Sequence, residues 1–177
     1  MATLREVVAE IEASGGYARA VVCDVSDEAF VRHAVAAAIG DAGRLDFGVN
    51  SAGVSGGDDL RPTADYATGT FDRIVAIDLR GTFLSMKYEL EQMASQGFGS
   101  IVNLASGAGL VSVPGFSGYT AAKHGVIGLT RTAALDYGSL GIRVNAIAAG
   151  LVATPLVATG RSARIAAHPL GTHCATR

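Results

Sequence analysis

Three residues in the middle of the chain have side chains that together could transfer a proton. Ser106 precedes Tyr119 by thirteen positions, and Lys123 follows the tyrosine by four. Because helix positions i and i+4 lie on one face, the phenol and the ammonium would point into the same space. A nearby positive charge favours phenolate and lowers the pKa of a tyrosine from its ordinary value of about 10. Such a tyrosine can act as general acid or base on an alcohol or carbonyl, with the Ser106 hydroxyl holding the reacting oxygen.

The same spacing also has a purely structural interpretation. Pairs four residues apart are common on helix surfaces, and a lysine often lays its alkyl stem along apolar surface while its ammonium reaches water. The elements around Tyr119 and Lys123 must therefore decide between the two interpretations.

Short apolar runs alternate with helical patterns along the chain. Apolar residues at helical spacing predict helices over 4–11, 26–39, 71–93 and 117–137, and Ser26 is the expected N-cap of the second helix. The apolar runs predict strands over 17–23, 45–49, 101–104 and 142–147. This alternation predicts an α/β fold with right-handed crossovers and a parallel sheet buried on both faces.

Residues suited to ligand binding follow all four predicted strands. They are Asp24, the stretch 50–53 (Asn-Ser-Ala-Gly), Ser106 and the pair 149–150 (Ala-Gly). Ligands bind such sheets at the carboxyl ends of the strands. Each residue type is also ordinary in loops. Four such sites, together with Tyr119 and Lys123 on the helix after the third strand, favour a ligand site over loop chemistry.

Composition limits the class of protein. The 177 residues are 49% hydrophobic and 17% charged, which is typical of one globular domain. The net charge of −2 and the lack of a basic cluster argue against nucleic-acid binding. The sequence shows no signal-peptide pattern and no apolar run long enough to span a bilayer, so we expect a cytoplasmic protein. Cys23 and Cys174 are too few and too far apart for a zinc site or a disulfide framework, and no metal is expected.

Five motifs in one order make the sequence resemble the classical short-chain dehydrogenase/reductase family. They are C-D-V-S at 23–26, V-N-S-A-G at 49–53, I-V-N-L-A-S at 101–106, Y-T-A-A-K at 119–123 and G-I-R-V-N-A-I at 141–147. The likeness covers about residues 4–156 of a single partial domain, 1–177. The resemblance implies a Rossmann-type fold and hydride transfer between NAD or NADP and a small alcohol or carbonyl substrate.

The resemblance also implies roles for individual residues. Tyr119 would be the proton donor or acceptor, Lys123 would lower its pKa and bind the nicotinamide ribose, and Ser106 would position the substrate oxygen. Asp24 would contact the adenine, Asn50 and its neighbours the adenosine side, and Thr154 the nicotinamide carboxamide. The implied cofactor-binding positions are Asp24, Val25, Asn50, Ala52, Gly53, Tyr119, Lys123, Gly150, Val152 and Thr154.

The sequence departs from the family pattern at both ends. Family members begin with a strand, a glycine-rich turn for the diphosphate and a second strand, and no G-x-G-x-x-G run occurs here. We therefore expect an incomplete Rossmann-type sheet without the first two strands, the glycine-rich loop and the last strand, and a divergent tail over 157–177. Unpaired strand edges would leave the isolated chain loosely folded or prone to aggregate.

Two local departures lie near the expected site. Asp78 stands where the family usually has an asparagine that completes a catalytic tetrad, and the helical pattern turns it inward. An inward aspartate must be hydrogen-bonded, paired or protonated, and a pairing with Lys123 would alter the field at Tyr119. A partly solvated aspartate in the same backbone role is the alternative. Ala149 replaces a family proline, which loosens a turn.

Two classes of function follow from these observations. The first is an NAD(P)-dependent oxidoreductase acting on secondary alcohols and ketones or aldehydes. The second is an inactive fragment, or a subunit-association remnant unable to bind the dinucleotide alone. The family pairs the helices at 71–93 and 117–137 between subunits, so a homo-oligomer is the expected assembly.

Overall fold

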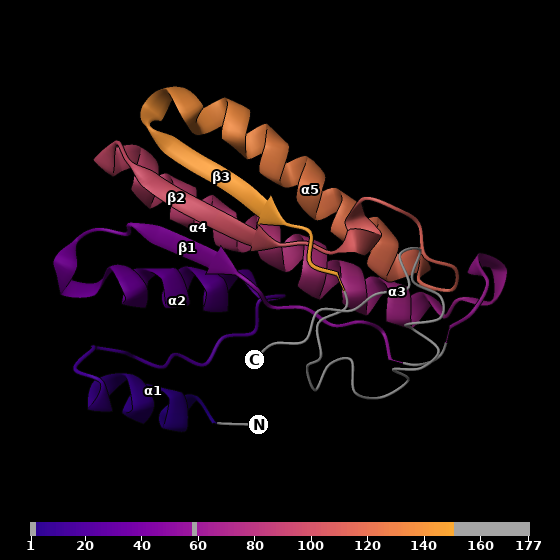
Figure 1. Cartoon of the computed structure of the whole chain (residues 1–177), viewed down its shortest axis with the longest axis horizontal. Helices are drawn as coiled ribbons and strands as arrows, with labels where there is room; N and C mark the ends of the chain where they lie inside the picture. The colour runs from indigo at the N-terminus through magenta and orange to yellow at the C-terminus, as the bar shows by residue number, and fades with distance from the viewer. Residues whose placement is uncertain (1–2, 58–59, 151–177) are drawn as a thin grey trace.

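The computed structural model describes residues 3–57 and 60–150 of the chain. Figure 1 shows the strands beside a group of helices. The helices are α1 (Leu4–Ala13), α2 (Glu28–Ile39), α3 (Thr68–Ile74), α4 (Gly81–Gln96) and α5 (Ser117–Tyr137), and the strands are β1 (Phe47–Asn50), β2 (Gly99–Leu104) and β3 (Ile142–Ile147).

The strands form one parallel sheet in the order β1-β2-β3. Val49 of β1 is in register with Val102 of β2, and Ile101 of β2 is in register with Val144 of β3. The chain passes from β1 to β2 through α3 and α4, and from β2 to β3 through α5. Parallel neighbours require such crossover connections. The predicted α/β fold with a parallel sheet is confirmed.

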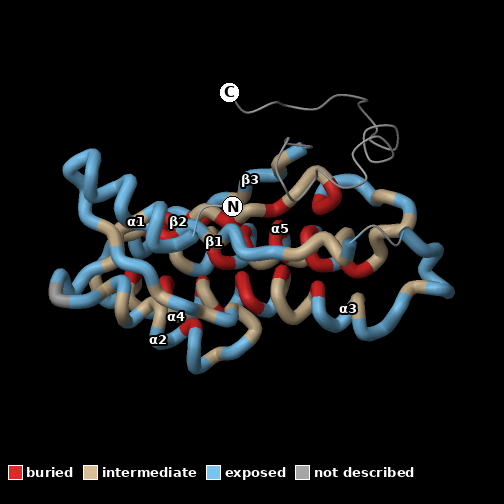
Figure 2. Tube along the Cα trace, turned by 90° about the horizontal axis from the view of Figure 1, so that it is seen from below, coloured by how far each residue is buried: buried red, intermediate tan, exposed pale blue. Residues whose placement is uncertain are grey.

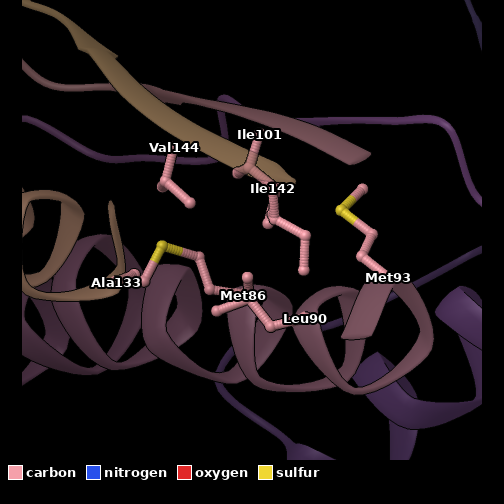
Figure 3. Close-up of a cluster of buried hydrophobic side chains, with 7 residues drawn as sticks. All are labelled: Met86, Leu90, Met93, Ile101, Ala133, Ile142 and Val144. Atoms are coloured by element: carbon pink, nitrogen blue, oxygen red, sulfur yellow. The ribbon is translucent and has the colours of Figure 1, made fainter. Parts of the chain in front are cut away.

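One helical layer covers one face of the sheet. On that face α4 packs beside α2 on one side and beside α5 on the other (Figures 1 and 2). The core between the layers joins α4 and α5 to β2 and β3 (Figure 3) and consists of Met86, Leu90, Met93, Ile101, Ala133, Ile142 and Val144. The alternate strand residues point the other way, and Phe47 and Val49 are 73% and 66% exposed. The expectation of a sheet buried on both faces is therefore wrong for this part of the chain.

The predicted strand over residues 17–23 is also wrong. Residues 16–24 have no regular secondary structure, and Tyr17 and Val22 are 86% and 81% exposed. Apolar and β-branched composition describes how well a segment fits a half-buried sheet, and a strand forms only where a neighbour completes its hydrogen bonds. Within residues 3–57 and 60–150, no strand pairs with this segment.

The N-cap of helix α2 lies one residue later than predicted. This N-cap is Asp27, whose Oδ1 accepts from the N–H groups of Ala29 and Phe30 at 2.8 and 3.2 Å. Ser26, the predicted cap, instead donates its own N–H and hydroxyl to Oδ1 of Asp24 at 2.9 and 2.7 Å. Strand β1 likewise begins at Phe47, two residues after the predicted start.

The single long helix predicted over 71–93 is divided into three parts. α3 ends at Ile74, a π-helical segment runs over Val75–Arg80, and α4 follows from Gly81. π-Helical turns are rare and often occur at functional sites, and this one contains Asp78. No helix in the described residues is both long and apolar enough to cross a bilayer.

Candidate active site

A buried ion pair lies between α5 and the π-helical segment. The ammonium of Lys123 is 3.1 Å from Oδ2 of Asp78 and donates a hydrogen bond to the carbonyl of Leu104 at 3.0 Å. Asp78 is fully buried and Lys123 is 5% exposed. Leu104 is the last residue of β2, so the hydrogen bond to its carbonyl holds the lysine at the carboxyl end of that strand.

The second oxygen of Asp78 binds the backbone beyond β1. The N–H of Val54 donates to Oδ1 of Asp78 at 2.8 Å. Burial raises the pKa of the Asp78 carboxyl above its ordinary value, and the Lys123 ammonium and the Val54 N–H offset part of that rise. The inward orientation predicted from the helical pattern is what the structure shows, and the partly solvated alternative does not apply.

Tyr119 lies one helical turn before Lys123 on α5. The lysine Nζ is 5.5 Å from the centroid of the tyrosine ring, and the tyrosine is half-buried. The edge of the ring packs on Phe116, with 6.1 Å between the centroids. The positive charge is therefore near the phenol, as the spacing of four residues predicts, and the carboxylate of Asp78 partly neutralises it.

Ser106 follows β2 by two residues and is held against α5. Its hydroxyl accepts from the N–H of Ala108 at 3.2 Å and so caps the short turn Gly107–Gly109. A Cβ atom on Gly109 would lie 2.6 Å from the carbonyl oxygen of Lys123, so only glycine allows this close packing. The turn therefore places Ser106 at the same sheet edge as Lys123.

The turn after β1 reaches the ion pair. A Cβ on Gly53 would lie 2.9 Å from Oδ2 of Asp78 and 3.5 Å from Nζ of Lys123. Ala52 and Gly53 are exposed, whereas the side chain of Asn50 turns inward and donates hydrogen bonds to other side chains. This segment therefore presents backbone, and not the Asn50 amide, to solvent.

The remaining predicted cofactor positions are spread along the same edge. Val25 packs on α4, where a Cβ on Gly81 would lie 2.8 Å from Cγ2 of the valine. Asp24 is exposed, and the hydrogen bonds from Ser26 lower its pKa below the ordinary value. Gly150 is exposed at the end of the described residues. Val152 and Thr154 lie outside them.

Comparison with known proteins identifies the family. Residues 1–173 match the family model described as enoyl-(acyl carrier protein) reductase, and matching relatives include a named short-chain dehydrogenase/reductase from Armillaria gallica. The chain belongs to the short-chain dehydrogenase/reductase family. The resemblance inferred from the five motifs is confirmed.

Individual relatives agree with this assignment. Levodione reductase of Leifsonia aquatica is 48% identical over 136 residues, which cover 77% of this chain and 50% of that protein. The crystal structure of NAD⁺-bound xylitol dehydrogenase superposes with a TM-score of 0.86 at 32% identity, covering 97% of this chain and 73% of that one. ElxO with NADP bound gives a TM-score of 0.76 at 33% identity, covering 86% and 63%. The chain thus spans about half the length of levodione reductase.

The groups around the ion pair of this dehydrogenase/reductase chain can be compared with the groups that a nicotinamide dinucleotide needs for binding. An ammonium has three N–H donors. Lys123 donates a hydrogen bond to the carbonyl of Leu104 and forms an ion pair with Asp78, whose Oδ2 accepts no hydrogen bond from the described residues, so an N–H can still be donated to a ribose hydroxyl. The backbone of Gly53 lies close against the ion pair, since a Cβ there would be 2.9 Å from Oδ2 of Asp78, and Ala52 and Gly53 are exposed on their other side. These groups fit the ribose and adenosine portions of a nicotinamide dinucleotide.

Sequence reasoning missed a set of buried polar residues beneath this edge. Glu89 is 7% exposed, Asn103 is fully buried and Thr130 is 4% exposed. A signal was present for Glu89, because it lies three residues after Met86 and four before Met93 on the apolar stripe of α4. A carboxylate on such a stripe needs a buried partner.

Proposed function

We propose that the protein is an NAD(P)-dependent oxidoreductase that interconverts a secondary alcohol and a ketone or aldehyde. The observation that carries this proposal is the buried Lys123 ammonium, 5.5 Å from the Tyr119 ring and fixed by Asp78 and Leu104. An ordinary surface lysine would extend to water, and this one is 5% exposed. Family membership and the names of the relatives support the same reaction class.

Tyr119 is the proposed general acid and base. In the oxidative direction its phenolate accepts the hydroxyl proton of the alcohol, and in the reductive direction its phenol donates that proton to the developing alkoxide. Lys123 stabilises the phenolate through its charge and binds a ribose hydroxyl through an N–H that it does not donate to Leu104. When bound, the nicotinamide donates or accepts the hydride.

Ser106 is the proposed donor to the substrate oxygen. Its hydroxyl oxygen accepts from Ala108, which leaves the hydroxyl proton available for a reacting carbonyl or alkoxide. A donor that is fixed before the reaction stabilises developing negative charge without reorganising. The short turn that Ser106 caps, packed on α5 through Gly109, supplies that rigidity.

The proposed cofactor is NAD or NADP, held along the strand ends by the segments around Val25, Gly53 and Gly150. The substrate is a small alcohol or carbonyl compound, as the names levodione reductase and xylitol dehydrogenase suggest by analogy. We also propose that subunits associate through α4 and α5. In support, Phe83 on α4 and Leu135 on α5 are 46% and 84% exposed.

Titration of the full-length protein with NADH and with NADPH tests this function. We expect enhancement of nicotinamide fluorescence with one or both, followed by reduction of the oxidised form when a panel of secondary alcohols is added. Failure to bind either dinucleotide would contradict the proposal and favour the inactive-remnant alternative.

A further inference from the structure

Glu89 is a buried carboxylate for which the proposed chemistry has no use. It lies on α4 with 7% of its surface exposed, and Oε2 accepts a hydrogen bond from Nδ2 of Asn50 at 2.9 Å. Burial raises the pKa of Glu89, and the bond from Asn50 offsets part of that rise. A buried carboxylate costs stability unless its oxygens are hydrogen-bonded or paired with a positive charge, so the hydrogen bond from Asn50 offsets part of the cost.

The strand opposite Glu89 has a glycine where the carboxylate lies. A Cβ atom on Gly48 would be 2.6 Å from Oε1 of Glu89 and 2.9 Å from Oε2. Any other residue at position 48 would push the carboxylate away from β1. Gly48 and Glu89 are thus a matched pair, and together they allow the carboxylate to reach Asn50.

Glu89 sets the orientation of a chain of side-chain hydrogen bonds. Because an ionised carboxylate only accepts, Asn50 must direct Nδ2 toward it, and the second proton of that amide goes to Oδ1 of Asn103 at 3.0 Å. The amide nitrogen of Asn103 then donates to Thr130 at 2.9 Å, and the Thr130 hydroxyl donates to the carbonyl of Val126 at 2.7 Å. The carboxylate therefore fixes the Asn50 side chain in one orientation.

Asn50 begins the segment that borders the proposed cofactor site. Residues 50–54, here named the dinucleotide wall, start at the last residue of β1 and end at Val54, whose N–H binds Asp78 at 2.8 Å. Glu89 therefore anchors one end of the wall and Asp78 the other. Asp78 belongs to the π-helical segment, and Glu89 belongs to α4, which follows that segment directly.

We propose that Glu89 is a positioning residue for dinucleotide binding: through Asn50 it holds the dinucleotide wall in the conformation that receives the adenosine side of the cofactor. This inference rests on the proposed function for its binding step. It rests only on the contacts of Glu89, Gly48 and Asn50 for the ordering of the wall.

Kinetics of two substitutions at position 89 in the full-length protein test the inference. Glu89→Leu removes the acceptor, and we expect KM for the dinucleotide to rise roughly tenfold while kcat at saturation stays within about twofold. Glu89→Gln keeps an acceptor of the same shape, so its KM should stay within about threefold of the wild-type value. A purely stabilising role would lower the melting temperature of Glu89→Leu and leave KM unchanged.

Gly48→Ala supplies an independent route to the same defect. The new methyl group displaces the carboxylate, so KM for the dinucleotide should rise as in Glu89→Leu. In the double variant the two effects should not add, because each breaks the same contact. Additive effects would mean that Gly48 and Glu89 act separately.

Hydrogen–deuterium exchange over residues 50–54 needs no dinucleotide and separates this inference from the proposed function. We expect faster exchange there in Glu89→Leu and wild-type exchange in Glu89→Gln. Unchanged exchange in a folded Glu89→Leu overturns the inference, even if the wild-type protein binds the cofactor. If neither Glu89→Leu nor Gly48→Ala folds while Glu89→Gln folds and binds normally, Glu89 is a stability residue and the inference is also overturned.

Discussion

The ammonium of Lys123 lies 3.1 Å from Oδ2 of Asp78, and both side chains are buried. The pair gives the chain a local charge balance that a neutral asparagine at position 78 would not give. The buried positive charge beside the Tyr119 ring is therefore balanced by Asp78, a residue that takes no part in the proposed proton transfer.

Asp78→Asn should lower the free energy of unfolding. The substitution removes one partner of a buried ion pair and leaves the Lys123 ammonium without its counter-charge, at a cost of about 3–5 kcal/mol. Urea unfolding of the variant and of the wild-type protein at neutral pH measures the difference. Asp72→Asn removes an exposed carboxylate from α3 and serves as the control. An unfolding free energy of Asp78→Asn equal to that of wild type would show that the ion pair does not stabilise the buried lysine.

Glu89→Gln should remove a pH-dependent loss of stability. The pKa of Glu89 is raised in the folded state, so the folded protein binds the proton more tightly than the unfolded chain does. The stability that this proton contributes is fully present below the unfolded pKa of about 4.3, and it is lost as the pH rises through the folded pKa. Relative to wild type, the glutamine variant should gain unfolding free energy on going from pH 4 to 7, by about 1.4 kcal/mol for each unit of raised pKa. Urea unfolding across that range measures the gain.

Glu91→Gln provides the matched control for this stability experiment. Glu91 lies on the same helix and is exposed. Because that side chain is exposed, its substitution should change the free energy of unfolding by no more than about 0.5 kcal/mol. If the two glutamine variants follow the same curve, burial of Glu89 does not perturb its titration.

Gly109→Ala should destabilise the protein. The added methyl would lie 2.6 Å from the carbonyl oxygen of Lys123, and backbone must move to relieve the contact, at a cost of about 1–3 kcal/mol. Gly128→Ala, in open space on α5, should instead stabilise the helix by up to about 1 kcal/mol. Thermal unfolding of both variants tests the packing of the Ser106 turn on α5. Equal melting temperatures for the two would contradict it.

The sequence predicts correctly those helices and strands whose pattern depends only on their own residues. α5 and β3 have the predicted bounds, because helical periodicity and a short apolar run are local features. The segment 17–23 fails as a strand because pairing is a property of two segments, and a run of apolar residues says nothing about its neighbour. The division of the long helix at Val75–Arg80 is likewise not visible in the apolar pattern.

The candidate site was predictable through its side chains and not through its backbone partners. The inward turn of Asp78 and its possible pairing with Lys123 follow from helix periodicity. The carbonyl of Leu104 and the N–H of Val54 complete the site, and neither has a sequence signature. Asn50 shows the limit of motif reasoning, since its amide binds Glu89 and Asn103 beneath the edge.

Turnover by Tyr119→Phe in the full-length protein tests directly whether Tyr119 is the acid–base residue. We expect kcat to fall by about 10²–10⁴-fold while the dissociation constant for the dinucleotide changes little, because only the proton-transfer group is lost. Tyr137→Phe, at the end of the same helix, should retain wild-type kcat. A Tyr119→Phe enzyme that binds the dinucleotide and turns over alcohol at the wild-type rate would contradict the assignment of Tyr119 as the acid–base residue.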